Sequence, residues 1–399
     1  MFEKYRKLLG GSLIVAGTSI GAGMLALPIV TGIGGFFPAL IIYLAVWVIT
    51  TATGFLLAEL ALRFPKGTNL ISMADHYLGK PGKIFCWVIF IFLCYTISIA
   101  YLSKGGSLIQ MVTGESVPNN ICMIIFLFIF GTIVYLGAKT VDRINILLMA
   151  GLIISYLALF FAGGKHINFS YYFTKTDLSL SALSLPVILT SFGYQIVVPT
   201  LTDYFEKNSK MIRQAIFLGT TITLVIYLFW EMLILGILPI EVLKQAKIAG
   251  ETAIEPLKNY AKIHAVYGIG QFFSFFAITT SFLGVELALF DFLADGFKIP
   301  KTGMKKLFIA GVTFIPPLII TLFFPNLFII ALGYAGGIGV NFLMIFLPAW
   351  MAWKGHYIVK DKFLFEQLPR EKIFLIFIFI FSAAEVAIEI IDEIIRITS

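Results

Sequence analysis

Two short stretches of the chain combine glycines and hydroxyl side chains with a following proline, inside long apolar segments. The first is residues 17–23 (GTSIGAG), with Pro28 downstream. Each glycine costs a helix about 1 kcal/mol relative to alanine, and a proline removes an N–H donor. A helix broken here frees N–H groups at the positive end of a helix dipole, which favours a bound carboxylate. Close packing of membrane helices explains the same glycines, so this stretch alone leaves two interpretations.

The second stretch is residues 189–195 (LTSFGYQ), followed by Pro199. It lies five apolar segments after the first and is expected to cross the membrane in the opposite direction. Interrupted helices at corresponding positions of two inverted halves indicate a binding site near the middle of the membrane. The pair therefore predicts a small-molecule site where the two breaks cross.

Ionisable side chains inside apolar segments are costly, and each is a functional hypothesis by default. They are Glu59, Lys104, Glu231, Glu286, Asp291 and Glu385. Glu59 and Asp291 lie near segment ends, where an interfacial role explains them equally well. Lys104 and Glu231 share a depth that allows an ion pair, whereas Glu286 lies at a different depth. Glu286 and Glu231 are candidate proton carriers, and Lys104 is their rival because a buried lysine changes its charge readily.

The elements that position these residues lie in lipid. Of the 399 residues, 59% are hydrophobic and 13% are charged, and the mean hydropathy is +0.96. Soluble domains have about 25% charged residues, because a globule in water covers itself with polar side chains. The formal charge of +7 is placed as orientation in a bilayer requires, which fits better than nucleic-acid binding.

A membrane-spanning helix needs about 20 mainly apolar residues, and eleven such segments follow one another here. They are predicted at 8–31, 36–62, 84–112, 121–138, 144–163, 181–202, 214–238, 264–293, 306–324, 327–352 and 373–391. The first is too long for a signal peptide and is expected to be retained. The predicted fold class is an all-α polytopic membrane protein that forms a single domain over 1–399.

Basic residues in the connections predict the orientation, because cytoplasmic loops are enriched in Lys and Arg. With the N-terminus inside, 21 Lys and Arg fall in cytoplasmic segments and 7 in outer ones. An odd number of spans then places the C-terminus outside.

Two connections are long. Residues 65–82, inside, are expected to include a short interfacial helix, and residues 239–263, outside, an amphipathic segment over the outer mouth. Each is interpreted either as a gate or as a simple connector. Cys86, Cys94 and Cys122 lack metal-ligand spacing and are expected to be packed thiols.

Four motifs are spread along the chain: AGTSIGAGMLALPIV in span one, SFGYQIVVPTL in span six, SFLGVELALFDFLADGF in span eight, and LFFPN…GYAG around spans nine and ten. With their collinear spacing, they resemble the hydroxy and aromatic amino acid permease family, which includes bacterial tyrosine- and tryptophan-specific permeases. The resemblance implies the leucine-transporter fold, with discontinuous spans one and six. Two inverted five-span repeats are expected over 8–163 and 181–352, and an extra helix over 373–391. It also implies the bacterial inner membrane, with a cytoplasmic N-terminus and a periplasmic C-terminus.

The resemblance also implies roles at the breaks. The substrate carboxylate is expected at the N–H groups of Gly21, Ala22 and Gly23, and the ammonium at carbonyls around Thr18 and Ser191. The substrate side chain is expected between spans one, three, six and eight, where aromatic rings stack on it and the Gln195 amide hydrogen-bonds a phenol or indole. The full expected set is Thr18, Ser19, Gly21, Ala22, Gly23, Tyr101, Ser191, Phe192, Gly193, Tyr194 and Gln195.

The implied function is secondary active, proton-coupled uptake of an aromatic amino acid by alternating access, with tyrosine foremost and tryptophan or phenylalanine as alternatives. Sodium is the other coupling ion, because sodium-dependent proteins of this fold use a Ser/Thr pair on span eight. Thr280 and Ser281, with Thr279 beside them, lie at a suitable place, although such hydroxyls usually bond back to the preceding turn.

Other classes of protein fit less well. A metal-ion transporter of this fold needs Asp, Asn, Met or His at the breaks, and residues 17–23 supply none. The sequence has no HExxH helix, nucleotide loop or Ser–His pair at one depth, so no enzyme is expected. The expected partners are the amino acid, H⁺ or Na⁺ and the lipid bilayer, without cofactor, metal, nucleic acid or obligate protein partner.

Overall fold

A computed structural model describes residues 2–113, 116–174, 176–259, 264–359 and 371–398. Within these ranges the chain forms helices and turns and no strand. Ten helices are long and apolar enough to cross a membrane, and a bent pair of helices at the start of the chain makes an eleventh span. The predicted all-α polytopic architecture is therefore confirmed.

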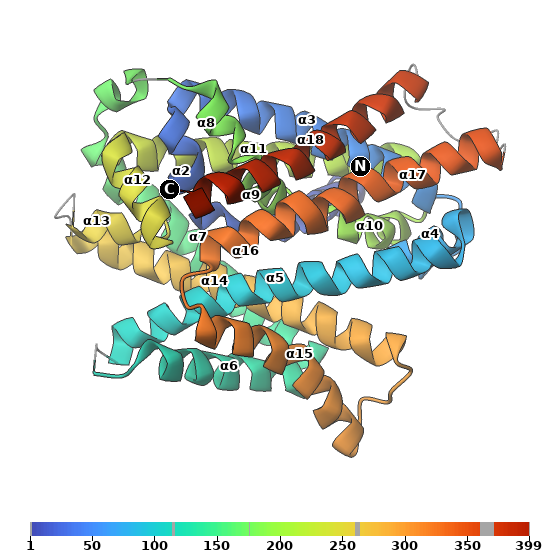
Figure 1. Ribbon diagram of the computed structural model, residues 1–399. Helices are drawn as coiled ribbons and strands as arrows, with labels where there is room; N and C mark the ends of the chain where they lie inside the picture. Colours follow the sequence, from blue (N-terminus) through green and yellow to red (C-terminus); the bar gives the residue numbers. More distant parts are fainter. Residues whose placement is uncertain (1, 114–115, 175, 260–263, 360–370, 399) are drawn as a thin grey trace.

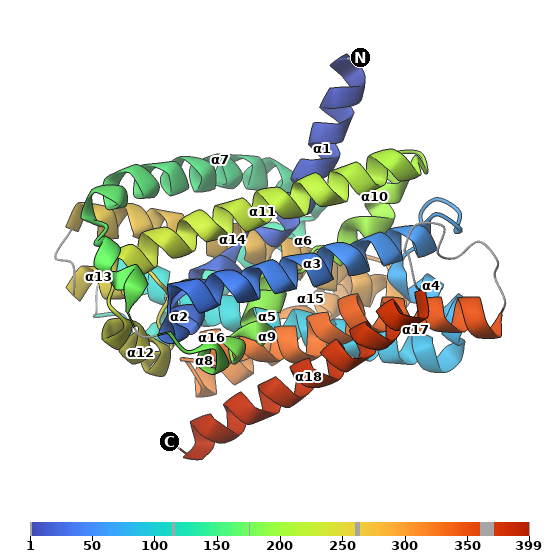
Figure 2. The ribbon, with the colours of Figure 1, turned by 90° about the horizontal axis from the view of Figure 1, so that it is seen from above.

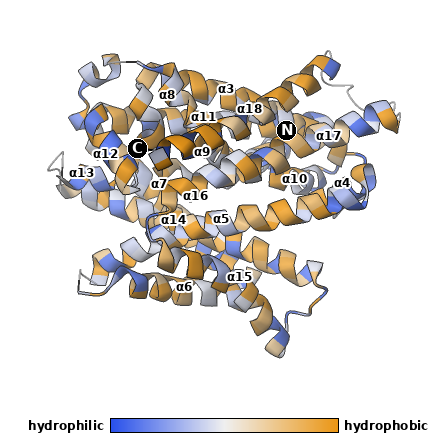
Figure 3. Cartoon of the chain, viewed as in Figure 1, coloured by the Kyte–Doolittle hydropathy of each residue, from blue (hydrophilic) through white to orange (hydrophobic). Residues whose placement is uncertain are grey.

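Eight spans are single helices that lie side by side (Figure 1). They are α3 (Phe36–Ala61), α5 (Lys80–Thr113), α6 (Asn119–Leu136), α7 (Ala138–Gly163), α11 (Ser209–Ile237), α14 (His264–Gly296), α15 (Gly303–Phe323) and α18 (Glu371–Thr398). Hydrophobic residues cover most of their length, and hydrophilic residues gather toward the ends of the bundle (Figure 3). Helix α18 extends seven residues past the predicted boundary at 391, because polar residues continue the helix beyond its apolar part.

Spans one and six are interrupted. Span one comprises α1 (Phe2–Ser19), η1 (Ala22–Leu25), α2 (Leu27–Thr31) and η2 (Gly32–Gly34), with a bend of 51° at the break. Span six comprises α9 (Leu185–Ser191), η5 (Gln195–Val197) and α10 (Val198–Tyr204). The interruptions fall within the predicted stretches 17–23 and 189–195, where glycine weakens the helix and a proline begins the next helical piece.

Short helices mark the two ends of the bundle. Helix α4 (Leu70–Leu78) lies at one end and confirms the helix predicted within 65–82; α12 (Ile240–Ala249) and α13 (Glu255–Asn259) lie at the opposite end (Figure 1). Both α12 and α13 lie in the predicted outer segment 239–263, of which residues 260–263 lie outside the described residues. The connection between spans five and six adds η3 (Gly164–His166), η4 (Phe169–Phe173) and α8 (Leu178–Ala182). We call the two ends the α4 end and the α12 end.

Span ten contains a long π-helix that the sequence analysis did not anticipate. It runs through α16 (Phe328–Tyr334), η6 (Ala335–Phe346), α17 (Leu347–Trp353) and η7 (Lys354–Ile358), of which η6 and η7 are π-helical. Such wide turns are rare and often occur at functional sites. Gly336 brings η6 against α9, because a Cβ there would overlap the carbonyl oxygen of Pro186.

We expect Gly336→Ala to destabilise the fold. Alanine favours a helix, but here its methyl overlaps backbone rather than a movable side chain, and overpacking of this kind costs about 1–3 kcal/mol. The thermal unfolding midpoint of the purified protein in detergent measures the effect. The control is Gly311→Ala on α15, where the nearest atom to a Cβ is Ile315 Cδ1 at 3.7 Å. Equal midpoints for the two variants would contradict the close contact between η6 and α9.

Candidate functional site

The first break brings span one against spans six and eight. The chain is extended at Gly21 (φ −159°, ψ −157°), before η1 begins. The N–H of Ala22 donates to the Ser281 hydroxyl of α14 at 3.0 Å, and a Cβ at Gly21 would overlap that same oxygen. A Cβ at Gly23 would lie 2.8 Å from the Ser191 Oγ of α9. The two glycines therefore permit a close approach that larger residues would prevent.

A single hydroxyl joins the two breaks. The buried Tyr227 side chain of α11 places its hydroxyl 2.7 Å from the carbonyl oxygen of Ser19 and 2.7 Å from that of Ser191. These are the last residues of the half-helices α1 and α9, and their carbonyls have no partner within the helix. The one proton of the hydroxyl is shared between both carbonyls, so Tyr227 sets how far apart the breaks lie.

The same face of α11 holds the second half of span one. The Trp230 Nε1–H donates to the Met24 carbonyl at 2.8 Å. The buried Glu231 carboxylate accepts a hydrogen bond from the Tyr43 hydroxyl of α3 at 2.8 Å and another from the Thr31 hydroxyl, whose single proton is shared with the Leu27 carbonyl at 2.7 Å. Because two donors already compensate its charge, Glu231 fixes span one to α11 and α3.

A cavity of about 390 Å³ lies beside the two breaks. Its walls come from both broken spans, α5, α7, α14 and η6, and its volume is within the usual range of about 300–1,000 Å³ for small-molecule sites. Nine residues predicted from the sequence line it: Thr18, Ser19, Gly21, Gly23, Tyr101, Ser191, Gly193, Thr280 and Ser281. Backbone and hydroxyl groups thus meet apolar walls in one cavity.

The cavity extends toward the α4 end and is closed toward the α12 end. Asn145 near the start of α7 and Ala288 near the end of α14 line it, and both helices reach the α4 end there. Thr18 and Ala288 are exposed within it. On the other side, the Ala253 N–H donates to the Leu25 carbonyl at 2.9 Å and ties the α12–α13 connection to span one.

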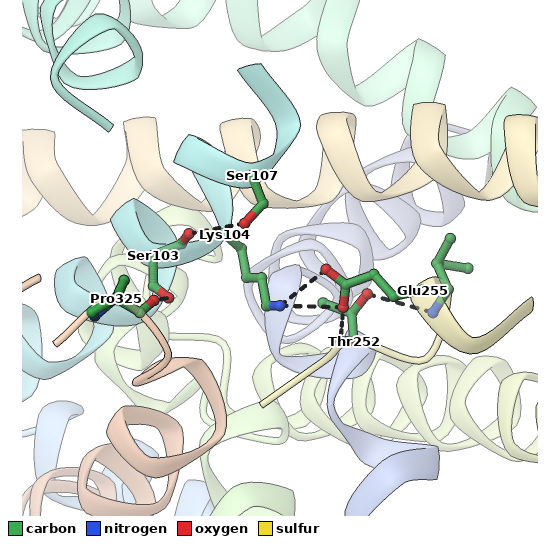
Figure 4. Close-up of polar contacts among 7 residues, drawn as sticks. Ser103, Lys104, Ser107, Thr252, Glu255 and Pro325 are labelled. Atoms are coloured by element: carbon green, nitrogen blue, oxygen red, sulfur yellow. Dashed lines mark hydrogen bonds and ion pairs between the residues drawn. The ribbon is translucent and has the colours of Figure 1, made fainter. Parts of the chain in front are cut away.

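An ion pair fastens α13 over the α12 end. The Lys104 Nζ of α5 lies 3.0 and 3.2 Å from the two carboxylate oxygens of Glu255, which also accepts the N–H of Thr252 (Figure 4). This corrects the expected Lys104–Glu231 pair. The partner of Lys104 comes instead from the connection that folds back over the bundle, while Glu231 faces span one and α3.

Three predicted pocket residues of the second break lie away from the cavity. The Tyr194 hydroxyl donates to the Thr50 carbonyl of α3 at 3.0 Å, and the Gln195 amide donates to the Thr53 hydroxyl at 3.2 Å. The Phe192 ring packs against tyrosine rings of α3 and α11. The structure therefore does not bring these side chains to the cavity, because the non-helical backbone at 192–194 turns them toward α3.

The predicted ion-coupling residues of α14 differ in their surroundings. The Thr280 hydroxyl bonds back to the Phe276 carbonyl at 2.8 Å, whereas the Ser281 hydroxyl faces the break. Glu286 is fully buried, and neither of its carboxylate oxygens makes a hydrogen bond to any residue that the structure describes. The described residues also hold no cluster of three His, Cys, Asp or Glu that could bind a metal ion.

Tyr227 and Trp230 hydrogen-bond the broken spans and were not predicted from the sequence. Tyr227 is one of 16 tyrosines, and nothing in its own neighbourhood marks it. The available signal was helical spacing, because Tyr227 lies four residues before Glu231 and three before Trp230, which places it next to each of them on the helix surface.

The chain is similar to known permeases over nearly its whole length. The model of the tryptophan/tyrosine permease family matches residues 4–388. The tryptophan-specific transport protein of Haemophilus influenzae is 32% identical over 84% of this chain and 84% of its own length. The tyrosine-specific transport system 1 of that organism is 32% identical over 87% of this chain and 88% of its own. The low affinity tryptophan permease of Escherichia coli is 30% identical over 88% of each.

These relatives are transport proteins rather than enzymes, and the residues that the family model matches include both broken spans and the cavity lining. The chain belongs to the tryptophan/tyrosine permease family.

Proposed function

We propose that this chain imports an aromatic amino acid across the bacterial inner membrane by proton symport and alternating access, with tyrosine foremost and tryptophan or phenylalanine also accepted. The observation that carries the proposal is the cavity in which backbone groups of both breaks face apolar walls. An amino acid needs both, because its charged groups match freed N–H and C=O groups and its ring matches an apolar surface. Relatives described as specific for tryptophan and for tyrosine support this substrate class.

The backbone of span one receives the substrate carboxylate in this proposal. The N–H of Ala22 is already bonded to Ser281, whereas the N–H groups of Gly21 and Gly23 donate to no residue that the structure describes. The ammonium is placed at the carbonyls of Ser19 and Ser191. Each carbonyl oxygen has two lone pairs, so each retains an acceptor site beside the Tyr227 hydroxyl.

The substrate ring is placed against α5, α7 and η6. Tyr101 and Phe90 of α5 and Met344 of η6 line the cavity, and rings pack favourably on aromatic and thioether groups. Asn145 also lines it, and the Asn145 Oδ1 has no hydrogen-bond partner among the described residues. We assign to Asn145 the recognition of a phenol or indole N–H that the sequence suggested for Gln195.

The proposed architecture is the leucine-transporter fold, with inverted repeats over 8–163 and 181–352 and an extra helix over 373–391. The excess of basic residues in the connections at the α4 end supports a cytoplasmic α4 end, a cytoplasmic N-terminus and a periplasmic C-terminus. In that orientation the cavity opens to the cytoplasm, and the conformation is inward-facing.

Glu286 is the proposed proton carrier. Its carboxylate lacks a partner, whereas Glu231 has two donors and Lys104 has an ion pair, so only Glu286 of these three has a charge that its surroundings leave uncompensated. Its neighbour Val285 lines the cavity, and Glu286 itself lies beside the lining residues without being one of them. Sodium is the second candidate ion, supported by the Ser281 oxygen at the break.

A competition panel tests substrate and ion together. In proteoliposomes, an inward proton gradient with sodium replaced by choline should drive accumulation of labelled tyrosine. Unlabelled tyrosine, tryptophan and phenylalanine should compete, and lysine, aspartate and alanine should not. Failure of every amino acid to compete would overturn the proposed function. Accumulation that requires sodium at a fixed proton gradient would overturn proton coupling alone.

We expect Gly21→Ala to reduce uptake at least about 10-fold, because its methyl overlaps the Ser281 hydroxyl and covers the proposed carboxylate site. The matched control is Gly268→Ala on α14, where a Cβ meets nothing within 4 Å. Initial uptake rates and thermal midpoints are measured for both variants.

A double variant separates packing from binding at Gly21. In Gly21→Ala/Ser281→Ala the overlapping oxygen is gone, and the nearest atom of residue 281 is Cβ at 3.6 Å. The thermal midpoint should recover while uptake remains low. Full recovery of uptake would show that Gly21 serves packing only.

We expect Glu286→Gln to abolish accumulation driven by a proton gradient and to retain substrate exchange. Glutamine keeps the size of the side chain but cannot take up and release a proton at neutral pH. The two modes are measured as gradient-driven uptake and as counterflow in the same proteoliposomes, with Glu241→Gln on α12 as the exposed control. Unchanged accumulation in Glu286→Gln would exclude Glu286 as the carrier.

A further inference from the structure

Span eleven turns its charged face into the protein. Helix α18 lies at the edge of the bundle beside α17 (Figure 2). Many of its outward residues are isoleucines, and five charged residues near its end recur at helical spacing on one face. That face carries Glu385, Glu389, Asp392, Glu393 and Arg396, and the exposed isoleucines are Ile390, Ile391, Ile394 and Ile395.

Two of these carboxylates are already paired. Asp392 lies 3.2 Å from the Lys247 Nζ of α12, and Glu393 forms an ion pair with Arg396. The Lys247–Asp392 and Arg396–Glu393 pairs are each neutral, so Asp392 and Glu393 need no further positive charge.

Glu385 and Glu389 are not paired. Glu385 is fully buried, and neither of its oxygens has a hydrogen-bond partner within the described part of the chain. Glu389 is 9% exposed and makes no hydrogen bond or ion pair with a described residue. The two lie one helical turn apart, so both charges together repel each other at close range. A buried carboxylate without a partner is costly unless a positive charge joins it.

The facing π-helix offers another acceptor and no donor. Gly333 and Gly337 leave room for Glu389, since a Cβ at Gly333 would lie 3.1 Å from the Glu389 Oε1. One turn further, the Asn341 Nδ2 donates to the Ser382 carbonyl of α18 at 2.9 Å, and the Asn341 Oδ1 has no partner among the described residues. Gly337 faces Glu389 and Asn341 bonds Ser382, so η6 and α18 run antiparallel and Glu385 lies at the level between Gly337 and Asn341.

A second cavity gives access to this acceptor cluster. It has a volume of about 480 Å³ and lies between α18, α16, α9 and α12, toward the α12 end. Glu389 lines it together with apolar side chains such as Val187 and Ile329. It is separate from the cavity at the breaks, because the two share no lining residue.

We propose that Glu385 and Glu389 bind a small monovalent cation, a proton or a sodium ion, that enters from the α12 end. Carboxylate and amide oxygens are hard ligands that suit such ions.

The other ionisable groups around the site are paired. On α18 these are Asp392, Glu393 and Arg396; α12 contributes Lys247 to Asp392, and Tyr334 of α16 lies near Glu393 and Arg396. Helices α9 and α17 also pack against α18, and neither carries an ionisable side chain. A cation that binds here therefore changes the charge of the two glutamates and of no neighbouring group.

Binding of a cation at this site can affect the cavity at the breaks, because η6 contacts both. Val340 and Met344 line the cavity at the breaks, while Gly337 and Asn341 on the same π-helix face α18. This link to transport rests on the proposed function; cation binding itself does not.

The test uses the purified full-length protein in detergent. Thermal midpoints are measured with sodium against choline at pH 7.5, and at pH 5.5 against pH 7.5 without sodium. We expect one of the two cations to raise the midpoint, and Glu385→Gln and Glu389→Gln to lose at least half of that shift. The matched control Glu241→Gln, exposed on α12, should keep the whole shift. Shifts in both glutamine variants that equal the unmodified protein's, or no shift in the unmodified protein, would overturn the proposal.

A second measurement avoids dependence on variant folding. Dicyclohexylcarbodiimide reacts with protonated carboxyl groups in apolar surroundings, and mass spectrometry locates the adduct in the unmodified protein. Labelling of Glu389 that falls with sodium identifies a sodium site, and labelling that falls only with rising pH identifies a proton site. Absence of labelling at Glu385 and Glu389 at every pH would overturn the proposal. Neither measurement involves transport, so aromatic amino acid uptake can fail or succeed independently of the result.

Discussion

Backbone groups freed inside a lipid bilayer must find partners in the protein, because the hydrocarbon offers no water. Both interrupted spans face this constraint, and single side chains of neighbouring helices meet much of it. The Tyr227 hydroxyl hydrogen-bonds the carbonyls of Ser19 and Ser191, and the Trp230 indole N–H donates to the Met24 carbonyl. From α14, the Ser281 hydroxyl accepts the N–H of Ala22. The groups left over after these bonds are the ones that a ligand can use, so the same constraint holds the breaks together and defines the site between them.

The part of span one after the break is hydrogen-bonded to α11, whereas α1, before the break, diverges from that part. Helix α11 holds the part after the break through Trp230 and Glu231, while α1 bends away by 51° (Figure 2). The held part, together with the Lys104–Glu255 pair, closes the α12 end, and the divergent part leaves the cavity open toward the α4 end. In the proposed function, a substrate ammonium uses the second lone pairs of the Ser19 and Ser191 carbonyls, beside the Tyr227 hydroxyl. The bound substrate would then join the same two half-helices and favour conformations in which both carbonyls remain this close, which is a direct route from occupancy to a change of conformation.

Local features of the chain predict the spans, the two breaks and helix α4, because hydropathy, glycine and proline act within a few residues. The directions of side chains beyond a break are not local. Each residue of a helix turns by about 100°, so two or three residues of irregular backbone at 192–194 redirect Phe192, Tyr194 and Gln195 from the cavity to α3. The partner of Lys104 was missed for a related reason, since Glu255 lies 151 residues away in a connection that folds back over the bundle. The π-helix of span ten was missed as well, because its turns differ from α-helical ones by a single residue and leave no distinct pattern of hydrophobicity.

From the sequence alone, every charge inside a span is a functional hypothesis. The structure separates these charges into those with a hydrogen-bond or ion-pair partner and those without one. Glu231 receives two hydrogen bonds, and Lys104 has an ion pair and lies 5.9 Å from the Phe328 ring centroid, so both are compensated as they stand. Removing or adding a proton at either would leave a partner unpaired, which low-dielectric surroundings oppose. Glu286 and Glu385 have no such partner among the described residues. A symporter needs a charge whose compensation arrives with the ion and departs with it. A carboxylate without a fixed partner can be compensated by the ion alone. A carboxylate that already has hydrogen-bond donors can do so only if those donors move away.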